Sequence, residues 1–498
     1  MKKMKKLVGI LLTLAMIVAM SVTAFAADIT IKGTGKEYKA YKLLNATNDT
    51  TDTTKFAYTL NDKYASILRE VTGKTDGAEI VKVISESADS IQSFADKVYN
   101  EVKKLDADYT TTNKTFKGVD QGYYLIVETV LDGDNDTYSL VMLDTVGTGN
   151  IEVTTKEDAP TLEKKVKEKN DSTGKETDWQ DGADYDLGDA VPFKLTGTVS
   201  ARYDNYTSYA YTFHDKMSNG LTLNYLENNT NDVKVYVDGT QITTGYTVVT
   251  DGLTDGCTFE VRFENLKDIS SVKAGSEITV EYTARLNENA VIGSTGNPNE
   301  ASLEYSNNPY GKGTGTTPWD KVIVFTYKLV ANKIDKDKHP LAGAGFTLYK
   351  LNASSGKYEA VGSEIKGTDE DPKTRFEFSH LDAGQYKLVE TTIPAGYNKA
   401  EDLIFTVEAT YDTTADNPQL TGLVIKGEGG ETVSSGENKV FTINLTEGSA
   451  TTDIVNHSGT ELPSTGGMGT TILYVIGAIL VIGAGILLIT KKRMNANK

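Results

Sequence analysis

The segment VKVYVDGTQITTGYTVVTDGLTDGCTFEVRF, residues 233–263, carries short runs rich in Val, Tyr and Phe that are separated by Asp-Gly pairs. Runs of this composition are typical of β-strands, and Asp-Gly pairs are typical of tight turns. We therefore expect strands at Val233–Val237, Tyr246–Thr250 and Phe259–Phe263. Several short strands joined by such turns predict an all-β sandwich.

The same pattern continues on both sides of this segment. It predicts a middle domain over residues 159–318, beginning at Ala159-Pro160, and a third sandwich over residues 319–457. In the middle domain the further expected strands are Val191–Leu195, Tyr206–His214, Ile278–Tyr282 and Ala301–Tyr305. In the third domain they are Phe346–Lys350, Arg375–Phe378, Gln385–Glu390, Leu403–Glu408 and Phe441–Leu445. The chain is thus predicted to be mainly β, with tandem immunoglobulin-like sandwiches.

Residues 27–158 have a mixed pattern and should form a first domain of the α+β class. Apolar residues recur at intervals of three and four from Val81 to Leu105, which indicates a helix, and Ala65–Val71 is a second candidate. Strands are expected at Ile29–Ile31, Tyr123–Thr129 and Ser139–Leu143. We interpret this domain as a β-sandwich with a helical insertion.

Composition excludes several classes of function. Lys and Arg number 51 against 69 Asp and Glu, a net charge of −18, so nucleic acid is not an expected partner. Four histidines and one cysteine do not suffice for a disulfide framework or a Cys/His zinc site. We expect Cys257 to be buried and inert, and Asp132–Asp136 to be a polar turn, because an EF-hand beginning at Asp132 would need Glu where Leu143 stands. No metal and no cofactor are expected.

The two ends of the chain indicate secretion and anchoring. Residues 1–26 combine a basic start, an apolar run from Leu7 to Met20 and an Ala-Phe-Ala site, which predicts a signal peptide cleaved after Ala26. Near the other end, residues 470–490 carry no charge and could span a bilayer, with a basic tail following at Lys491.

Residues 458–498 contain a pentapeptide directly before this span: Leu462, Pro463, Ser464, Thr465 and Gly466. The pentapeptide, the span and the basic tail together resemble the LPXTG cell-wall sorting signal of Gram-positive bacteria. The resemblance implies that a sortase attacks the carbonyl of Thr465, that Gly466 leaves, and that the mature chain comprises residues 27–465. Sortase and peptidoglycan are therefore expected partners.

Three further motifs carry a second resemblance. YKLVETTIPAGY at residues 386–397 resembles the E-box of Gram-positive pilins, and LAGAGF at 341–346 resembles the strand entry of their Cna-B-like domain. NEASLEYSNNP at 299–309 is similar to the closing segment of the fimbrial D2-type domain. The chain thus resembles the SpaA-type major, or backbone, pilins that sortases assemble.

Domains of this family are cross-linked by Lys–Asn isopeptide bonds, and the resemblance assigns residues to that chemistry. Burial lowers the pKa of a lysine and raises that of a carboxyl group, so a neutral amine can attack an amide while a neutral acid moves the proton. In the third domain the matching residues are Lys333, Asn456 and, as the catalytic acid, Glu390.

In the middle domain the matching residues are Lys164, Asn299 and, as the catalytic acid, Asp215. Lys165 and Asn297 are rivals, and since neighbouring strand residues face opposite ways, only one of the two lysines can point inward. In the first domain GYYLIVE at 122–128 echoes the E-box, but no lysine and asparagine match, and we expect no cross-link there.

Polymerisation in the family needs an acceptor lysine between the first two domains. The matching position here is Lys156, although Thr154-Thr155 stands where the family's pilin motif has Tyr-Pro. The alternative is that Lys156 is an ordinary linker lysine.

The resemblance implies a structural function, the backbone subunit of a covalent pilus on the cell surface, and not an enzyme that acts on external substrates. Copies of the same chain, and also minor pilins and host surface ligands, are the implied partners. The alternative is a wall-anchored adhesin that is displayed as a single chain.

Overall fold

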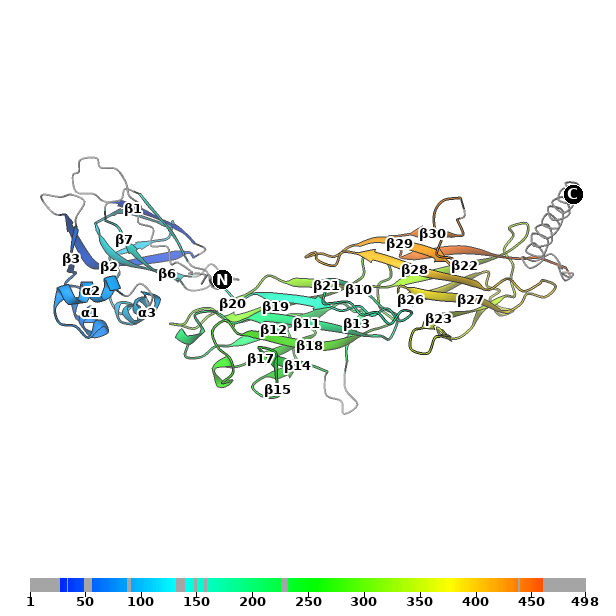
Figure 1. Cartoon of the computed structure of the whole chain (residues 1–498), viewed down its shortest axis with the longest axis horizontal. Helices are drawn as coiled ribbons and strands as arrows, with labels where there is room; N and C mark the ends of the chain where they lie inside the picture. Colours follow the sequence, from blue (N-terminus) through cyan, green and yellow to red (C-terminus); the bar gives the residue numbers. More distant parts are fainter. Residues whose placement is uncertain are drawn as a thin grey trace, which may run out of the picture.

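The computed structural model describes residues 27–459 except 34, 49–55, 87–90, 131–138, 147–149, 156–158, 225–231 and 438. Three β-rich domains follow one another along the long axis of the molecule, in the order of the sequence (Figure 1). Both the predicted class and the tandem arrangement are confirmed.

The first domain is a two-sheet structure with a helical insertion, as predicted. One sheet has the order β5-β1-β8, and the other has the order β3-β2-β6-β7 with β4 paired to β2. The elements are β1 (Ala27–Lys32), β2 (Glu37–Asn48), β3 (Phe56–Leu60), α1 (Ala65–Thr72), α2 (Gly77–Glu86), α3 (Ile91–Val102), β4 (Tyr109–Thr111), β5 (Thr115–Val119), β6 (Gly122–Val130), β7 (Leu140–Asp144) and β8 (Ile151–Thr154).

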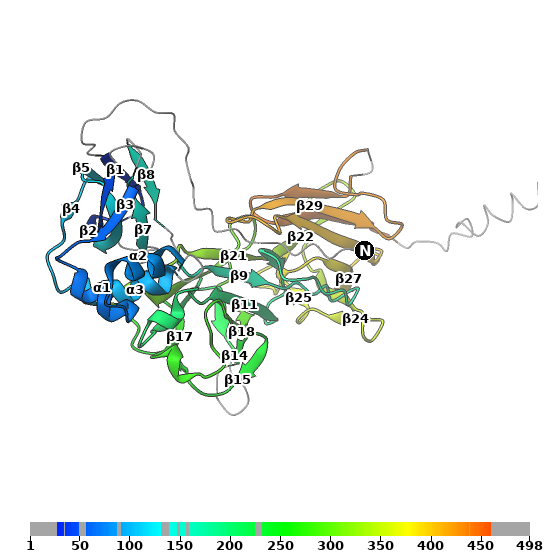
Figure 2. The ribbon, with the colours of Figure 1, turned by 60° about the vertical axis from the view of Figure 1, so that its left-hand side comes forward.

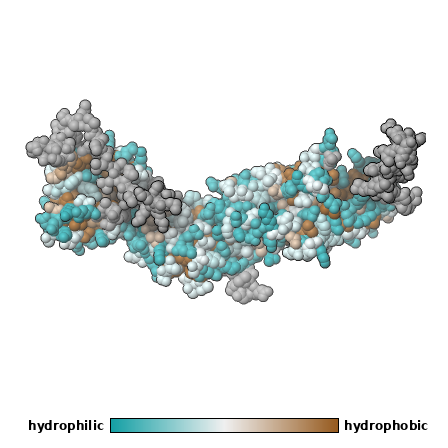
Figure 3. Space-filling model, viewed as in Figure 1, coloured by the Kyte–Doolittle hydropathy of each residue, from teal (hydrophilic) through white to brown (hydrophobic). Residues whose placement is uncertain are grey.

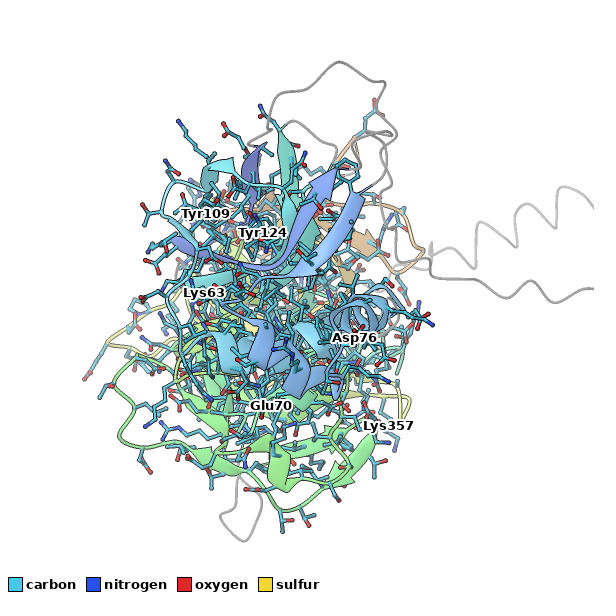
Figure 4. All side chains as sticks on the ribbon, turned by 90° about the vertical axis from the view of Figure 1, so that its left-hand side faces the viewer. Lys63, Glu70, Asp76, Tyr109, Tyr124 and Lys357 are labelled. Carbon is cyan, nitrogen blue, oxygen red and sulfur yellow. The ribbon has the colours of Figure 1, made fainter. Side chains whose placement is uncertain are left out.

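The larger sheet of the first domain buries both of its faces. Leu125 and Val127 on β6 face the helices, whereas Tyr124 and Ile126 on the same strand face the smaller sheet. This follows from the period of two along a strand. Figure 2 shows the three helices gathered below the strands of this domain. Figure 4 views the same end of the molecule, with Lys63, Glu70 and Asp76 around the helices and Tyr109 and Tyr124 at the strands above.

The helix predicted over Val81–Leu105 needs correction. The structure has two helices in this region, α2 and α3, and residues 87–90 between them are outside the described residues. Both helices present a buried apolar face, with Ile80 and Ile84 on α2 and Val98 on α3. Because each helix continues the spacing of three and four, the pattern alone did not reveal the division.

The middle domain is a sandwich of two sheets around one core. One sheet has the order β10-β21-β19-β12-β17-β16 with β20 on β19, and the other has the order β15-β14-β18-β11-β9 with β13 on β18. Its strands are β9 (Leu162–Val166), β10 (Gly182–Asp184), β11 (Ala190–Thr198), β12 (Tyr211–Met217), β13 (Leu221–Leu223), β14 (Lys234–Val237), β15 (Thr240–Ile242), β16 (Thr247–Val249), β17 (Phe259–Phe263), β18 (Glu277–Leu286), β19 (Asn297–Ser306), β20 (Thr314–Thr316) and β21 (Asp320–Phe325).

Two predictions for the middle domain change. The strand expected over Tyr206–His214 begins only at Tyr211, after a short 3-10 turn at Tyr203–Asn205. The boundary expected at residues 318/319 lies too early, because β21 pairs with β19 and β10 and so completes the sheet of the middle domain. Pairing between strands far apart in sequence, which local pattern does not encode, decides that boundary.

The third domain is a second sandwich. A sheet of order β26-β22-β31-β30 faces a sheet of order β24-β23-β27-β28-β29, with β25 on β23. Its strands are β22 (Tyr327–Asp335), β23 (Gly345–Asn352), β24 (Lys357–Ala360), β25 (Ile365–Lys366), β26 (Arg375–Leu381), β27 (Gly384–Thr392), β28 (Leu403–Tyr411), β29 (Leu420–Gly427), β30 (Phe441–Asn444) and β31 (Ser449–Asn456). The first and last strands, β22 and β31, are parallel neighbours.

Polar contacts join the third domain to the middle one. The amine of Lys350 lies 3.0 Å from Asp171 and 2.5 Å from Asp186 of the middle domain, and 2.6 Å from Asp382 of its own domain. Tyr411 donates a hydrogen bond of 2.9 Å to Asp184. The space-filling view shows a mixed, largely hydrophilic surface along this part of the molecule (Figure 3).

A second set of contacts joins the first domain to the middle one. Asp96 on α3 accepts hydrogen bonds from Arg202 at 3.0 Å, Asn205 at 2.6 Å and Tyr310 at 2.6 Å. A buried carboxylate with charged and neutral donors from two segments holds the helical insertion against its neighbour.

Candidate cross-linking sites

A buried polar cluster lies between the two sheets of the middle domain. Lys164 on β9 comes from one sheet, and Asp215 on β12 and Asn299 on β19 come from the facing sheet. All three side chains are fully buried at 0% exposure. The structure therefore brings together the three residues that the sequence analysis assigned to this domain.

Tyr282 on β18 stands at the centre of this cluster, and the sequence analysis missed it. Its hydroxyl donates to Asp215 Oδ2 at 2.6 Å and accepts from Lys164 Nζ at 2.9 Å and Asn299 Nδ2 at 2.8 Å. The ring is held by Phe193 and Phe259, with centroids 5.4 and 4.9 Å away. Nothing in the local sequence distinguishes this tyrosine from the other 26 of the 27 in the chain.

The electrostatics of the cluster favour its neutral form. Burial lowers the pKa of Lys164, although the adjoining carboxylate of Asp215, 2.5 Å from the amine, opposes the shift. Burial likewise raises the pKa of Asp215 against the effect of Lys164. Both shifts have the same physical cause, since a charge loses its hydration in an apolar core.

The rivals that the sequence left open occupy different surroundings. Lys165 points away from the core and forms ion pairs with Asp181 at 2.6 Å and Glu163 at 3.2 Å. Asn297 is buried, but its amide is used by the backbone of Val291 and Val324. The geometry therefore favours Lys164 and Asn299 over Lys165 and Asn297 as the residues of a cross-link in the middle domain.

The third domain holds a second buried cluster. Lys333 on β22 and Asn456 on β31 lie on the parallel first and last strands, and Glu390 on β27 reaches them from the facing sheet. Lys333 Nζ donates to Asn456 Oδ1 at 2.5 Å, and Asn456 Nδ2 donates to the two carboxylate oxygens of Glu390 at 2.9 and 3.1 Å. The lysine amine lies 3.6 Å from Glu390 Oε1.

The segment just after the E-box closes this second cluster. The backbone amide of Ala400 donates to Glu390 Oε2 at 2.7 Å, so the turn after β27 fixes the carboxyl group. The backbone of Asn398 bonds to His457 O at 3.0 Å, which ties the same turn to the last strand. Burial lowers the pKa of Lys333, opposed by the nearby Glu390. The amine is thus held against the amide, with an acid on the side of the amide nitrogen.

The first domain has a buried acid in its E-box-like segment. Glu128, the E-box-like glutamate, is 1% exposed and accepts a hydrogen bond of 2.9 Å from Tyr38. No lysine in the described part of this domain is buried. An arrangement like those of the other two domains is therefore not found within the described residues.

Several predicted sites lie outside the described residues. These are the signal peptide of residues 1–26, Lys156, the turn at Asp132–Asp136, the pentapeptide Leu462–Gly466 and the apolar segment 470–490. Over the part of the chain that is described, none of the helices could cross a membrane. Cys257 is described and is only partly buried, which corrects the prediction of full burial. Burial and the neighbouring Asp255 raise the pKa of its thiol.

Three family models match separate parts of the chain. Residues 187–309 match the family described as Gram-positive pilin backbone subunit 2, Cna-B-like domain, and residues 327–419 match the SpaA prealbumin-like fold domain. Residues 454–496 match the LPXTG cell wall anchor motif. The chain thus combines domains of Gram-positive backbone pilins with an LPXTG anchor. The match at 454–496 also makes this pilin a wall-anchored surface protein, and its relatives are structural subunits, not enzymes.

Individual relatives of this pilin are distant. The trypsin-resistant surface T6 protein of Streptococcus pyogenes serotype M6 is 28% identical over 402 residues, which cover 68% of this chain and 70% of that protein. The solved structure of the T6 backbone pilin has a TM-score of 0.49 at 19% identity and covers 88% of this chain and 100% of its own. The major pilin SpaD of Corynebacterium diphtheriae has a TM-score of 0.47 at 17% identity, with 87% and 98% covered.

Proposed function

We propose that this pilin is the shaft subunit of a sortase-polymerised pilus, and that each subunit is reinforced by two self-formed isopeptide bonds, Lys164–Asn299 and Lys333–Asn456. The observation that carries the proposal is the pair of fully buried lysine, acid and asparagine clusters. A buried ion pair contributes little to the free energy of folding, because the cost of removing both charges from water can exceed their attraction. Stability alone therefore does not explain two separate clusters of this composition.

The reaction follows from the positions of the atoms. The neutral amine of Lys333 attacks Cγ of Asn456, and the acid of Glu390 polarises the amide and gives its proton to the departing nitrogen. The Nζ–Cγ bond forms, the Cγ–Nδ2 bond breaks, and ammonia leaves. The amine's proton restores the acid. In the middle domain Asp215 takes the acid's place.

The two bonds would reinforce their domains in different ways. The third-domain bond joins the parallel first and last strands of one sheet, so tension applied at the domain ends passes through a covalent link. The middle-domain bond joins β9 in one sheet to β19 in the other, which clamps the sandwich across its core. Both would suit a shaft under shear.

The intact mass of the mature chain, residues 27–465, tests the chemistry. Two bonds lose two molecules of ammonia, so the mass should be roughly 34 Da below that of the sequence. Tryptic digestion should then yield branched peptides that join Lys164 to Asn299 and Lys333 to Asn456. An unshifted mass would refute the cross-links and leave the pilin assignment untouched.

Extracts of the native cell surface test the polymer. A ladder of high-mass, SDS-resistant species that contain this chain is expected of a shaft subunit. A monomer band alone would favour the alternative of a wall-anchored adhesin. Minor pilins and host ligands are further partners that such extracts would reveal by co-purification.

Tyr282→Phe should slow formation of the middle-domain bond, by about 100-fold if the hydroxyl works as a proton relay. The ring and its contacts with Phe193 and Phe259 remain, but the hydroxyl that links Lys164, Asp215 and Asn299 is lost. The measurement is a time course of intact mass in freshly expressed protein. Tyr211→Phe is the control, because Tyr211 is equally buried and bonds to Thr198 O instead. An unchanged rate in Tyr282→Phe would leave this tyrosine only a packing role.

A further inference from the structure

The outer face of the middle domain gathers nitrogen, sulfur and oxygen donors around one point. His214 lies on β12 directly before Asp215, so its side chain points away from the core that Asp215 enters. Glu260 is its register partner on β17. Asp255 and Cys257 come from the turn that leads into the same strand.

We propose that His214, Asp255, Cys257 and Glu260 form a binding site for Zn²⁺ on this face. His214 Nδ1 lies 2.9 Å from Asp255 Oδ2, 3.3 Å from Glu260 Oε1 and 4.0 Å from Cys257 Sγ. The ligand atoms of His214, Asp255 and Cys257 all lie within 4.8 Å of one another. Ligands of tetrahedral zinc are about 3.5 Å apart, so shifts on the order of an ångström would bring His214, Asp255 and Cys257 to that spacing, with Glu260 as the fourth donor beside His214.

The surroundings of the four donors are those of a metal site. The second ring nitrogen of His214, Nε2, lies 3.5 Å from Glu304 Oε2, and zinc-binding histidines commonly direct their other nitrogen at a carboxylate. Arg262 pairs with Glu260 Oε2, which leaves Oε1 for the metal. A thiolate and two carboxylates bring three negative charges, which Zn²⁺ and the Arg262 guanidinium balance.

The turn that carries two of the donors is held in place. Gly256 has φ of +82°, a conformation that glycine adopts readily, and it lets Asp255 and Cys257 face the same histidine. The amide of Cys257 bonds to Asp255 Oδ1 at 3.0 Å, and the amide of Thr258 bonds to the Asp215 carbonyl at 2.7 Å. Asp255 is 39% exposed, which leaves a path from solvent.

The composition of the set selects the metal. A thiolate and an imidazole favour zinc over calcium or magnesium, which take oxygen ligands. The sequence analysis expected no Cys/His zinc site from the small number of cysteines and histidines, but that count does not exclude a mixed site in which carboxylates supply the other ligands. On binding, the thiol loses its proton to solvent, as does the imidazole where it is charged.

The competing arrangement is an imidazolium that pairs with the same carboxylates and binds no metal. Titration of the mature, metal-free chain with Co²⁺ separates the two. A zinc-type site should give the visible absorption of tetrahedral cobalt and a near-ultraviolet band from the cobalt–thiolate bond. One equivalent of Zn²⁺ should remove both. No thiolate band, or a band that Zn²⁺ leaves unchanged, would overturn the proposal.

Variants locate the site. Cys257→Ser should lose the thiolate band, His214→Gln should lose binding, and Glu304→Gln should weaken it by roughly 10- to 100-fold. His457→Gln, an exposed histidine of the third domain, is the control and should bind like the wild type. Equal binding by all of these variants would place the metal elsewhere and refute the site.

A measurement on the unaltered chain guards against variants that do not fold. Zn²⁺ should slow the alkylation of Cys257, the chain's single thiol, and a chelator should restore it. Alkylation at the same rate with and without Zn²⁺ would contradict the proposal. Neither result depends on the isopeptide bonds or on polymerisation.

Discussion

Replacement of Glu390 by glutamine should yield a third domain that folds but keeps its full unreacted mass, one ammonia, or about 17 Da, above that of the cross-linked domain. Glutamine keeps the size of the side chain and can still accept from the Ala400 amide, but it cannot give up and regain a proton. Lys333 and Asn456 stay in contact and unreacted. Intact mass and a digest of the purified chain measure the outcome.

The same variant should be much less stable. The bond between Lys333 and Asn456 spans 123 residues, and closing a loop of that length contributes on the order of 4–5 kcal/mol in the loop-entropy treatment of cross-links. The third domain should therefore melt at a lower temperature and become cleavable by trypsin where the wild type resists. Glu390→Ala should also stay unreacted, and it should lose additional stability because truncation of the buried side chain leaves a cavity.

Glu408→Gln provides the matched control, because Glu408 is an exposed strand glutamate of the same domain. The Glu408→Gln protein should form the Lys333–Asn456 bond with loss of one ammonia, and its third domain should melt like that of the wild type. Should Glu390→Gln also lose ammonia from the third domain, Glu390 is not the proton-transferring acid, and the chemistry assigned to this cluster is wrong.

Lys156→Ala should abolish polymers while monomers remain attached to the wall. Lys156 is the proposed acceptor amine that reaches the acyl-enzyme of another subunit, and wall attachment uses only the pentapeptide at the other end of the chain. In the sequence Lys156 comes directly after Thr155, whose backbone amide donates a hydrogen bond of 3.0 Å to the carbonyl of Lys32 on β1. Immunoblots of wall extracts measure polymers and monomers together.

Lys32→Ala is the control for this prediction, since Lys32 pairs in register with Thr154 and its side chain is 60% exposed. It should polymerise normally. Thr465→Ala should lose both polymer and wall-attached monomer, because no acyl-enzyme forms. Ladders that persist in Lys156→Ala would assign the acceptor role to another exposed lysine.

Local pattern in the sequence determined much of this protein. Runs such as Phe259–Phe263 and Gln385–Glu390 lie on strands as expected, because the period of two along a strand is visible without knowledge of its partners. Linear motifs can likewise be recognised without knowledge of the partner strands. The family motifs placed Lys333, Glu390 and Asn456, and in the fold Asn456 forms hydrogen bonds with both of the other two.

Only the tertiary structure decided which residues face one another across the sheets. Lys164 and Lys165 are neighbours in the sequence, but their side chains lie on opposite faces of the sheet. Tyr282 enters the middle cluster only because β18 lies beside β11 and opposite β12. The boundary strand β21 and the donors around His214 were likewise assembled by pairing between distant segments. Strand periodicity is a local property, whereas register and sheet packing depend on contacts between residues far apart in the chain, and these bring the reactive groups together.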